Sequence, residues 1–402
     1  MKANCLKVFW LPVFFLLVFP VFAQINPPEI ISKSAVVMDA VTGTIVFSKN
    51  PDEEIPPASL TKLMTMHLAF REIRAGSASF DEIITPGRES WAVNQLPLSS
   101  VMNLASGQSA SLRELLLGMA IFSGNDAATA VAMRFAPSIA DFAEMMTMEA
   151  YALGLTKTRF VDASGYSEDN MTTAREFAEF CRVYLAENPD SIRDFHSVSE
   201  FAYPAAHNVP ERNRENPGTR VQRNRINLIG RVEGVDGLKT GFIFESGYNI
   251  ALTAERNGSR FIAVILGAPA EYRGDRIRDN DAENLIEWTF SRYKTIRPRP
   301  PAPEPVRVWK GRVNYAELAL SMPLDFTASV ERGEGLRWMI EHYEPLLAPL
   351  PAGTHAGNLV LSDNFGELRR IPLLTIAETE EGGFFKRIFD TIRLFFRRMR
   401  ST

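Results

Sequence analysis

The chain has 402 residues, an apolar fraction of 46% and a formal net charge of −4 at pH 7. This length allows one to three domains, and the apolar fraction is enough for a buried core. The excess of 48 acidic over 44 basic residues argues against a nucleic-acid-binding protein. The five histidines show no metal-ligand spacing, so we expect neither a metal nor another cofactor.

Residues 1–23 have the pattern of a secretory signal peptide. Lys2 and Lys7 precede an apolar stretch over 8–21, and Val21-Phe22-Ala23 places small residues where signal peptidase needs them. We expect cleavage before Gln24 and export of the mature chain. The alternative is an uncleaved membrane anchor, but the apolar run is short and is interrupted by two prolines.

Residues 24–296 alternate strand-like and helix-like patterns and are expected to form one catalytic domain. Strands are predicted at both ends of this segment, with helices between them, which favours an α/β (α+β) fold with helices packed on an antiparallel sheet. The predicted hairpins turn at 40–43 and at Asn257-Gly258. The predicted helices run from Ser59 to about Arg74, from Ser111 to Phe122 and from Asp126 to Phe135.

A proline-rich segment, 297–305, predicts a stiff linker and a domain boundary. The alternating patterns beyond it predict short strands, so residues 306–378 should form a small β-rich stalk domain. No cluster of reactive residues is recognisable in this second part.

The segment 383–400 predicts an amphipathic helix. Its cations occupy one face, with Asp390 as the only acid, and its other face is aromatic and aliphatic, which is typical of a helix lying in a membrane interface. The alternative is a helix that packs on the protein's own body or on a partner. The apolar residues are Phe384, Phe385, Ile388, Phe389, Ile392, Phe395, Phe396 and Met399.

Three short motifs carry the chemistry: Ser59-Leu60-Thr61-Lys62, Ser123-Gly124-Asn125 and Lys239-Thr240-Gly241. In this order they have the form S-x-x-K, S-x-N and K-T-G, which is the active-site set of penicillin-reactive serine enzymes. Ser59 and Lys62, three apart on a helix, share one face. Lys62 can activate the Ser59 hydroxyl only when it is neutral, and burial or a nearby cation such as Lys239 favours that form.

The other two motifs suit a peptide substrate that ends in a carboxylate. Ser123 can relay a proton from Lys62 to a leaving amine, and Asn125 offers both a donor and an acceptor. Lys239 and Thr240, expected just before a strand, can receive a carboxylate, and Gly241 lets substrate approach. The backbone N–H groups of Ser59 and Phe242 are expected to hold the oxyanion.

The three motifs with their flanking residues, Pro57–Thr65, Ser123–Ala128 and Val235–Gly241, resemble serine-type D-alanyl-D-alanine carboxypeptidases, the low-molecular-mass penicillin-binding proteins. The proline-rich junction, the β-rich domain and the C-terminal helix resemble the stalk and membrane anchor of that family. The resemblance therefore covers nearly the whole mature chain.

This resemblance implies a hydrolase of peptidoglycan synthesis that removes the terminal D-alanine from stem pentapeptides through an acyl-enzyme, is inhibited by β-lactams, and serves cell-wall biogenesis and cell shape. It implies Ser59 as nucleophile, Lys62 as base, Ser123 as proton relay, and Lys239 with Thr240 as carboxylate binders. Arg225 matches a family arginine near that carboxylate. The implied location is the periplasmic, outer face of the cytoplasmic membrane, with peripheral anchoring through 383–400.

Two features depart from the family pattern, and other functions stay open. Ile243 stands where many members have a threonine, and the long polar loop 208–225 has no assigned role. A D,D-endopeptidase of the same clan usually lacks the second domain. A serine β-lactamase needs a glutamate in an E-x-x-x-N setting, which Glu168 and Asp169 do not supply. A non-enzymatic binding protein is disfavoured by the intact motifs.

Overall fold

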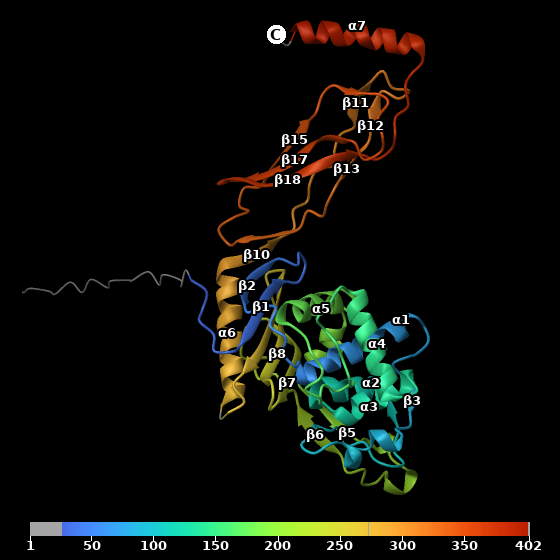
Figure 1. The fold of residues 1–402 in the computed structure, drawn as a ribbon, viewed down its shortest axis with the longest axis vertical. Helices are drawn as coiled ribbons and strands as arrows, with labels where there is room; N and C mark the ends of the chain where they lie inside the picture. The colour runs from blue at the N-terminus through green and yellow to red at the C-terminus, as the bar shows by residue number, and fades with distance from the viewer. Residues whose placement is uncertain (1–25, 272, 401–402) are drawn as a thin grey trace, which may run out of the picture.

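The computed structural model describes residues 26–271 and 273–400, and the predicted signal peptide, residues 1–23, lies outside these ranges. Within them, no helix combines the length and the apolarity that crossing a membrane requires. Figure 1 shows an elongated chain: a thick part that carries most helices, a β-rich part beyond it, and a last helix across the far end.

The thick part is built on a five-stranded antiparallel sheet in the order β2-β1-β9-β8-β7. Both predicted hairpins are present, and pairs such as Val36↔Val264 join the beginning of this part to its end. Strand β7 contains the Lys239-Thr240-Gly241 motif and forms one edge of the sheet, against the turn that carries Ser59. The strands are β1 (Ser34–Asp39), β2 (Ile45–Lys49), β7 (Val235–Ile243), β8 (Gly247–Arg256) and β9 (Ser259–Ala268).

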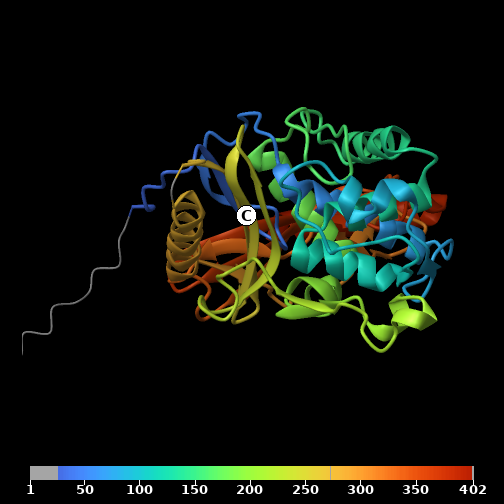
Figure 2. The ribbon, with the colours of Figure 1, turned by 90° about the horizontal axis from the view of Figure 1, so that it is seen from below.

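Helices cover both faces of this sheet, as Figure 2 shows with α6 on one side and the remaining helices on the other. Strand β9 is continuously apolar because both of its faces are covered. Ile262, Val264 and Leu266 pack into the core under α1 to α5, whereas the alternate residues Phe261, Ala263 and Ile265 pack with α6. The helices are α1 (Lys62–Arg74), α2 (Leu112–Leu117), α3 (Asn125–Phe135), α4 (Ile139–Ala152), α5 (Ala174–Glu187) and α6 (Gly274–Arg292).

The sequence analysis did not place helices α4, α5 and α6, and α6 shows why. It buries charged residues as well as apolar ones, so it lacks a clean apolar stripe. Asp281 is buried because its carboxylate accepts hydrogen bonds from the backbone N–H of Ile31 and from the N–H and hydroxyl of Ser32. A polar anchor thus replaces part of the apolar stripe that a sequence search looks for.

The β-rich part has its own core, formed by residues such as Val308, Leu359, Ile371 and Leu373. Its two larger sheets have the orders β12-β11-β16 and β13-β18-β17-β15. The predicted fold class is therefore confirmed, with helices on an antiparallel sheet followed by a small all-β unit and a C-terminal helix. The strands are β11 (Val306–Trp309), β12 (Tyr315–Ala316), β13 (Leu318–Leu320), β15 (Arg337–His342), β16 (Leu346–Leu347), β17 (His355–Asp363) and β18 (Gly366–Thr375).

A strand pair and a buried carboxylate hold the two parts together. Strand β10 (Tyr293–Ile296), which precedes the proline-rich segment, pairs with β14 (Phe326–Ser329), which follows it. Asp39, at the end of β1, accepts hydrogen bonds from the hydroxyls of Thr295 (2.7 Å) and Thr327 (2.9 Å). The junction is therefore fixed by contacts on both sides of the linker.

Candidate active site

The Ser59–Lys62 motif sits where the chain enters α1. Residues Ala58–Thr61 form a 3₁₀ turn, and the α-helix begins at Lys62, three residues later than the sequence predicts. Ala58 has a left-handed backbone (φ 51°), an unfavourable conformation for a residue with a Cβ. Such strain beside a reactive residue persists only where the surroundings impose it.

Lys62 is fully buried and its amine has three partners. Its Nζ lies 3.1 Å from Ser59 Oγ, 2.8 Å from Asn125 Oδ1 and 2.6 Å from the carbonyl oxygen of Ser164. A neutral amine has two N–H donors and one lone pair. If the two carbonyl oxygens take the two donors, the lone pair is left for the Ser59 hydroxyl.

Burial favours this neutral form of Lys62. The pKa of Lys62 is lowered from 10.5 to about 7, because desolvation, aided by the nearby Arg225, outweighs the opposing charges of Asp162 and Asp126. Arg225 is one cation that favours neutral Lys62, and Lys239, which the sequence predicts for this role, also interacts with Lys62 through charge repulsion. A lysine with a pKa near 7 is neutral in a large share of molecules at neutral pH.

The sequence analysis missed the loop that holds the Ser164 carbonyl. Asp162 Oδ1 accepts hydrogen bonds from the backbone N–H groups of Ser164 and Gly165, and Oδ2 accepts one from Ser167. Gly165 has to be glycine, since an added Cβ would lie 1.8 Å from the carbonyl oxygen of Ala58. The signal in the sequence was Asp-x-Ser-Gly, a typical carboxylate-capped turn.

Ser123 lies between α2 and α3, and Asn125 is the first residue of α3. The end of α2 widens into one π-helical turn, Gly118–Phe122, and Ser123 then takes a left-handed conformation (φ 59°). Asn125 uses both ends of its amide, because Oδ1 accepts from Lys62 and Nδ2 donates to Ser99 Oγ at 3.1 Å. The structure therefore connects the first two motifs directly.

The third motif lies inside the edge strand β7. The sequence predicted it just before a strand, so this prediction was wrong. Lys239 is buried, and its Nζ donates to the carbonyl oxygen of Thr240 at 2.9 Å. A Cβ on Gly241 would lie 2.8 Å from the carbonyl oxygen of Pro57 and 3.1 Å from the backbone nitrogen of Ser59. Gly241 thus lets β7 approach the Ser59 turn. The sequence predicted that substrate, and not this turn, would lie against Gly241.

Three basic side chains surround a fourth, Lys239. Burial lowers the pKa of Lys239 well below its usual value, and the charges of Lys62, Arg225 and Arg278 lower it further. Arg225, which follows β6 (Arg220–Arg223), donates to Ser100 Oγ at 2.7 Å. A bound carboxylate would relieve this repulsion.

A cavity of 270 Å³ opens at the site. Ser59, Asn125 and Phe242 line it, while Lys62, Ser123 and Lys239 are buried and are not among the lining residues. Part of its rim is apolar, and Leu98 and Phe244 are 92% and 68% exposed. The other lining residues are Pro97, Ser99, Ser100, Gly165, Tyr166, Ile243 and Glu245.

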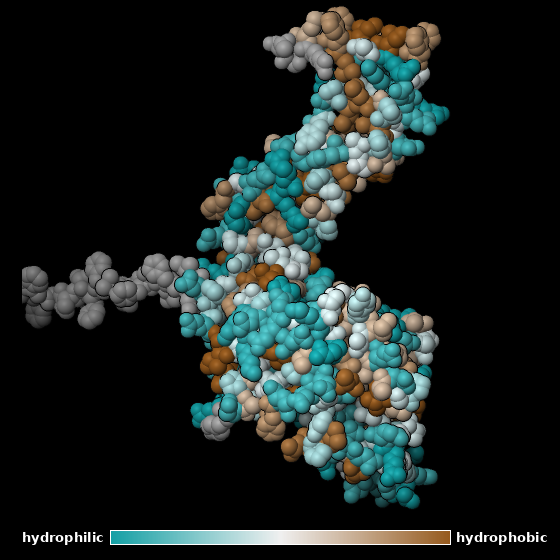
Figure 3. All heavy atoms as spheres, viewed as in Figure 1, coloured by the Kyte–Doolittle hydropathy of each residue, from teal (hydrophilic) through white to brown (hydrophobic). Residues whose placement is uncertain are grey.

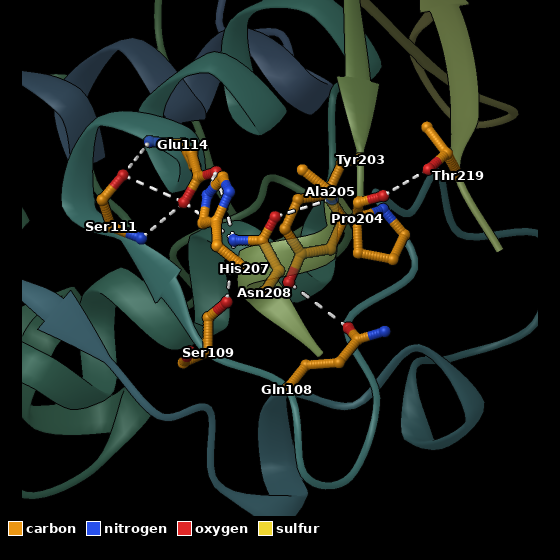
Figure 4. Close-up of polar contacts among 10 residues, drawn as sticks. All are labelled: Gln108, Ser109, Ser111, Glu114, Tyr203, Pro204, Ala205, His207, Asn208 and Thr219. Carbon is orange, nitrogen blue, oxygen red and sulfur yellow. Dashed lines mark hydrogen bonds and ion pairs between the residues drawn. The ribbon is translucent and has the colours of Figure 1, made fainter. Parts of the chain in front are cut away.

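Glu114 holds the beginning of the polar loop 208–225 (Figure 4). Glu114 completes a capping box with Ser111 at the start of α2, and it also accepts from Asn208 and contacts His207 at 2.9 Å. Burial raises the pKa of Glu114, but the hydrogen bonds from Ser111, Asn208 and His207 outweigh it and leave the pKa below its usual value.

The far end of the same loop braces one wall of the cavity. It returns as β6 (Arg220–Arg223), which pairs with β5 (Glu200–Tyr203). From β6, Arg220 donates to Asn103 Oδ1 and Gln222 donates to the carbonyl oxygen of Val101. The loop thus supports the segment that includes Ser99 and Ser100.

Comparisons with known proteins agree with this geometry. The family model described as D-alanyl-D-alanine carboxypeptidase matches residues 22–270. The D-alanyl-D-alanine carboxypeptidase DacC of Escherichia coli (strain K12) is 32% identical over 380 residues, which are 92% of this chain and 90% of that protein.

Solved structures give the same result. Penicillin binding protein 5 from Haemophilus influenzae is 27% identical, with a TM-score of 0.75 over 89% of this chain and all of that one. Penicillin-Binding Protein D2 from Listeria monocytogenes, in its ampicillin-bound form, is 28% identical, with a TM-score of 0.55 over 65% of this chain and all of that one. The chain therefore belongs to the D-alanyl-D-alanine carboxypeptidase family of serine peptidases.

Proposed function

We propose that the chain removes the terminal D-alanine from peptidoglycan stem peptides through an acyl-enzyme on Ser59. The observation that carries this proposal is the arrangement at Lys62. Two carbonyl oxygens are placed to accept its two N–H bonds, and its lone pair is left for the Ser59 hydroxyl at 3.1 Å.

In the proposed acylation, Ser59 Oγ attacks the carbonyl carbon of the penultimate D-alanine while its proton passes to Lys62 Nζ. The backbone N–H groups of Ser59 and Phe242 stabilise the oxyanion. The Ser123 hydroxyl relays the proton to the nitrogen of the leaving D-alanine, and water then hydrolyses the ester. Because the same attack opens a β-lactam ring, we expect β-lactams to form a stable ester with Ser59, in line with the ampicillin-bound relative.

The terminal carboxylate of the substrate is assigned to Lys239 and Thr240, with Arg225 nearby. Lys239→Gln should lower kcat/KM for a peptide ending in D-Ala-D-Ala roughly ten- to hundredfold, because a charge-assisted hydrogen bond is lost. For the same peptide with an amidated C-terminus, kcat/KM should fall only slightly. The measurement is steady-state release of D-alanine or D-alaninamide.

Lys294→Gln is the matched control, because Lys294 Nζ also donates to one backbone carbonyl, that of Val330 at 3.0 Å, but belongs to β10. It should leave both activities unchanged. Equal losses for the acid and the amide in Lys239→Gln would contradict the carboxylate role.

We also propose that the protein acts in the periplasm, attached to the outer face of the cytoplasmic membrane by α7 (Phe384–Arg400). All eight apolar side chains predicted for its membrane face are exposed, from Ile388 at 45% to Phe385 at 85%. Figure 3 shows apolar surface along α7 at the far end of the molecule.

The opposite side of α7 rests on the β-rich part through Asp390. This buried carboxylate accepts hydrogen bonds from the backbone N–H of Lys310 at 2.8 Å and from Lys386 Nζ at 2.5 Å. The alternative of a packing helix therefore accounts for one side of α7 but leaves its apolar side uncovered. A helix held in this way can lie in an interface with its apolar side in lipid.

Removing α7 should release the protein from membranes. Each fully buried Phe contributes on the order of 1.5–3 kcal/mol, and each cation near anionic lipid roughly 1 kcal/mol. A chain truncated after Glu381 should stay in the supernatant when it is sedimented with phospholipid vesicles, yet still label with fluorescent penicillin. The full chain carrying Phe385→Ser and Phe395→Ser should bind vesicles more weakly. Undiminished sedimentation of the truncated chain would place the anchor elsewhere.

A further inference from the structure

Helix α7 and strand β11 lie far from the sheet that carries the active site (Figure 1), and a second cavity, of 610 Å³, is lined by residues of both. It is lined by Arg307, Trp309, Arg393, Phe396 and Arg397. The polar groups of these side chains are all donors, because guanidinium groups and the indole nitrogen have no acceptor. The ligand that suits such a lining is an acceptor with negative charge.

Two of these donors are buried and have no partner. Trp309 is only 5% exposed, and its Nε1 makes no hydrogen bond, nor does the buried Nε of Arg307. The Arg307 guanidinium lies over the Trp309 ring, 4.2 Å from its centroid. Buried N–H groups are nearly always hydrogen-bonded in proteins, so two unpaired donors on side chains that line one cavity favour an acceptor ligand there.

The local charge is positive. Arg397 pairs with Glu344, and Asp390 pairs with Lys386 and lies 3.9 Å from Arg307. Arg393 stacks on Phe389 at 4.6 Å, and no carboxylate among the described residues lies within ion-pair distance of it. Among the described residues, two carboxylates therefore face four cations around this cavity, so an anion would find a positive surrounding.

We propose that this cavity binds the phosphate of an anionic phospholipid headgroup. Phe396 both lines the cavity and belongs to the exposed apolar side of α7, so the cavity opens where headgroups would lie if α7 lies in the membrane interface. A free phosphate ion would fill little of the volume and would leave the exposed Phe396 side chain uncovered. The proposal rests on the membrane attachment proposed above and adds to it a choice of lipid.

The indole N–H of Trp309 is a direct reporter. In the full chain labelled with ¹⁵N-tryptophan, soluble dihexanoyl phosphatidylglycerol should shift the Trp309 Nε1–H resonance in a saturable way. The resonance is identified by its loss in Trp309→Phe, with Trp338→Phe as the matched control in the same β-rich part. Dihexanoyl phosphatidylcholine and inorganic phosphate should each shift it far less.

Arg393→Gln should weaken the phosphatidylglycerol titration about fivefold or more. Arg387→Gln is the control, because it removes the same charge from the same helix at a residue that pairs with Glu381 and does not line the cavity. It should leave the titration unchanged. Equal weakening by both variants would reduce the effect to general attraction and overturn the proposal.

Other results overturn the proposal as well: no shift with phosphatidylglycerol, an equal shift with phosphatidylcholine, or an equal shift with inorganic phosphate, which would mean an adventitious ion only. Sedimentation with phosphatidylcholine vesicles, with and without phosphatidylglycerol, separates the two proposals. If the full chain binds neither vesicle, the membrane attachment fails. If it binds vesicles but the Trp309 resonance does not respond, only the lipid site fails.

Discussion

Ser59→Ala is expected to abolish covalent labelling by fluorescent penicillin and turnover of D-Ala-D-Ala peptides. The hydroxyl it removes lies at the cavity, 3.1 Å from Lys62 Nζ, and water at that position cannot form the ester. The change removes one oxygen from a turn held by other contacts, so the folded state should persist. The measurements are gel fluorescence after labelling and the melting temperature.

Ser77→Ala serves as the control for Ser59→Ala, since Ser77 is exposed and its hydroxyl donates to Glu72 at the end of α1. It should label like the unmodified chain. Labelling of Ser59→Ala at a peptide containing another serine, such as Ser123, would show that the nucleophile has been assigned wrongly.

Lys62→Met should lower the rate of acylation by about 10²–10⁴, because the general base is lost while the buried aliphatic stem is kept. The loss should be similar for penicillin and for peptides, with or without a free carboxylate, which distinguishes this lysine from Lys239. Stopped-flow or time-resolved labelling gives the rate. The effect on stability is expected to be small by comparison, because the desolvation of a buried amine is relieved as its hydrogen bonds are lost.

Lys49→Met tests whether the loss of any lysine with carbonyl partners lowers the rate of acylation. Lys49 Nζ donates to the carbonyl oxygens of Ile30 and Ser32, both at 2.8 Å, and lies on β2 away from the cavity. This variant should lose some stability and keep its acylation rate. A Lys62→Met protein that acylates at the unmodified rate would exclude Lys62 as the base.

The sequence by itself determined the fold class and the family, and it predicted the residues of the active site. Local sequence patterns were enough for these predictions, because each predicted feature depends on residues that are close together along the chain. The three-residue spacing of Ser59 and Lys62 sets one helical face, the Asn257-Gly258 turn sets a hairpin, and the period of 383–400 sets an amphipathic helix. The three motifs keep their meaning because their order and chemistry are readable without coordinates.

Only the tertiary structure decided which groups act on which. The Ser164 carbonyl reaches Lys62 from 102 positions away, and the loop that presents it is shaped by Asp162, whose role no local pattern connects to the serine. Likewise, Gly241 is required because β7 crosses the Ser59 turn. The unpaired Trp309 N–H is a candidate ligand donor only because α7 and β11 together line a cavity. These contacts join distant segments, so their energies depend on packing that spacing along the chain does not encode.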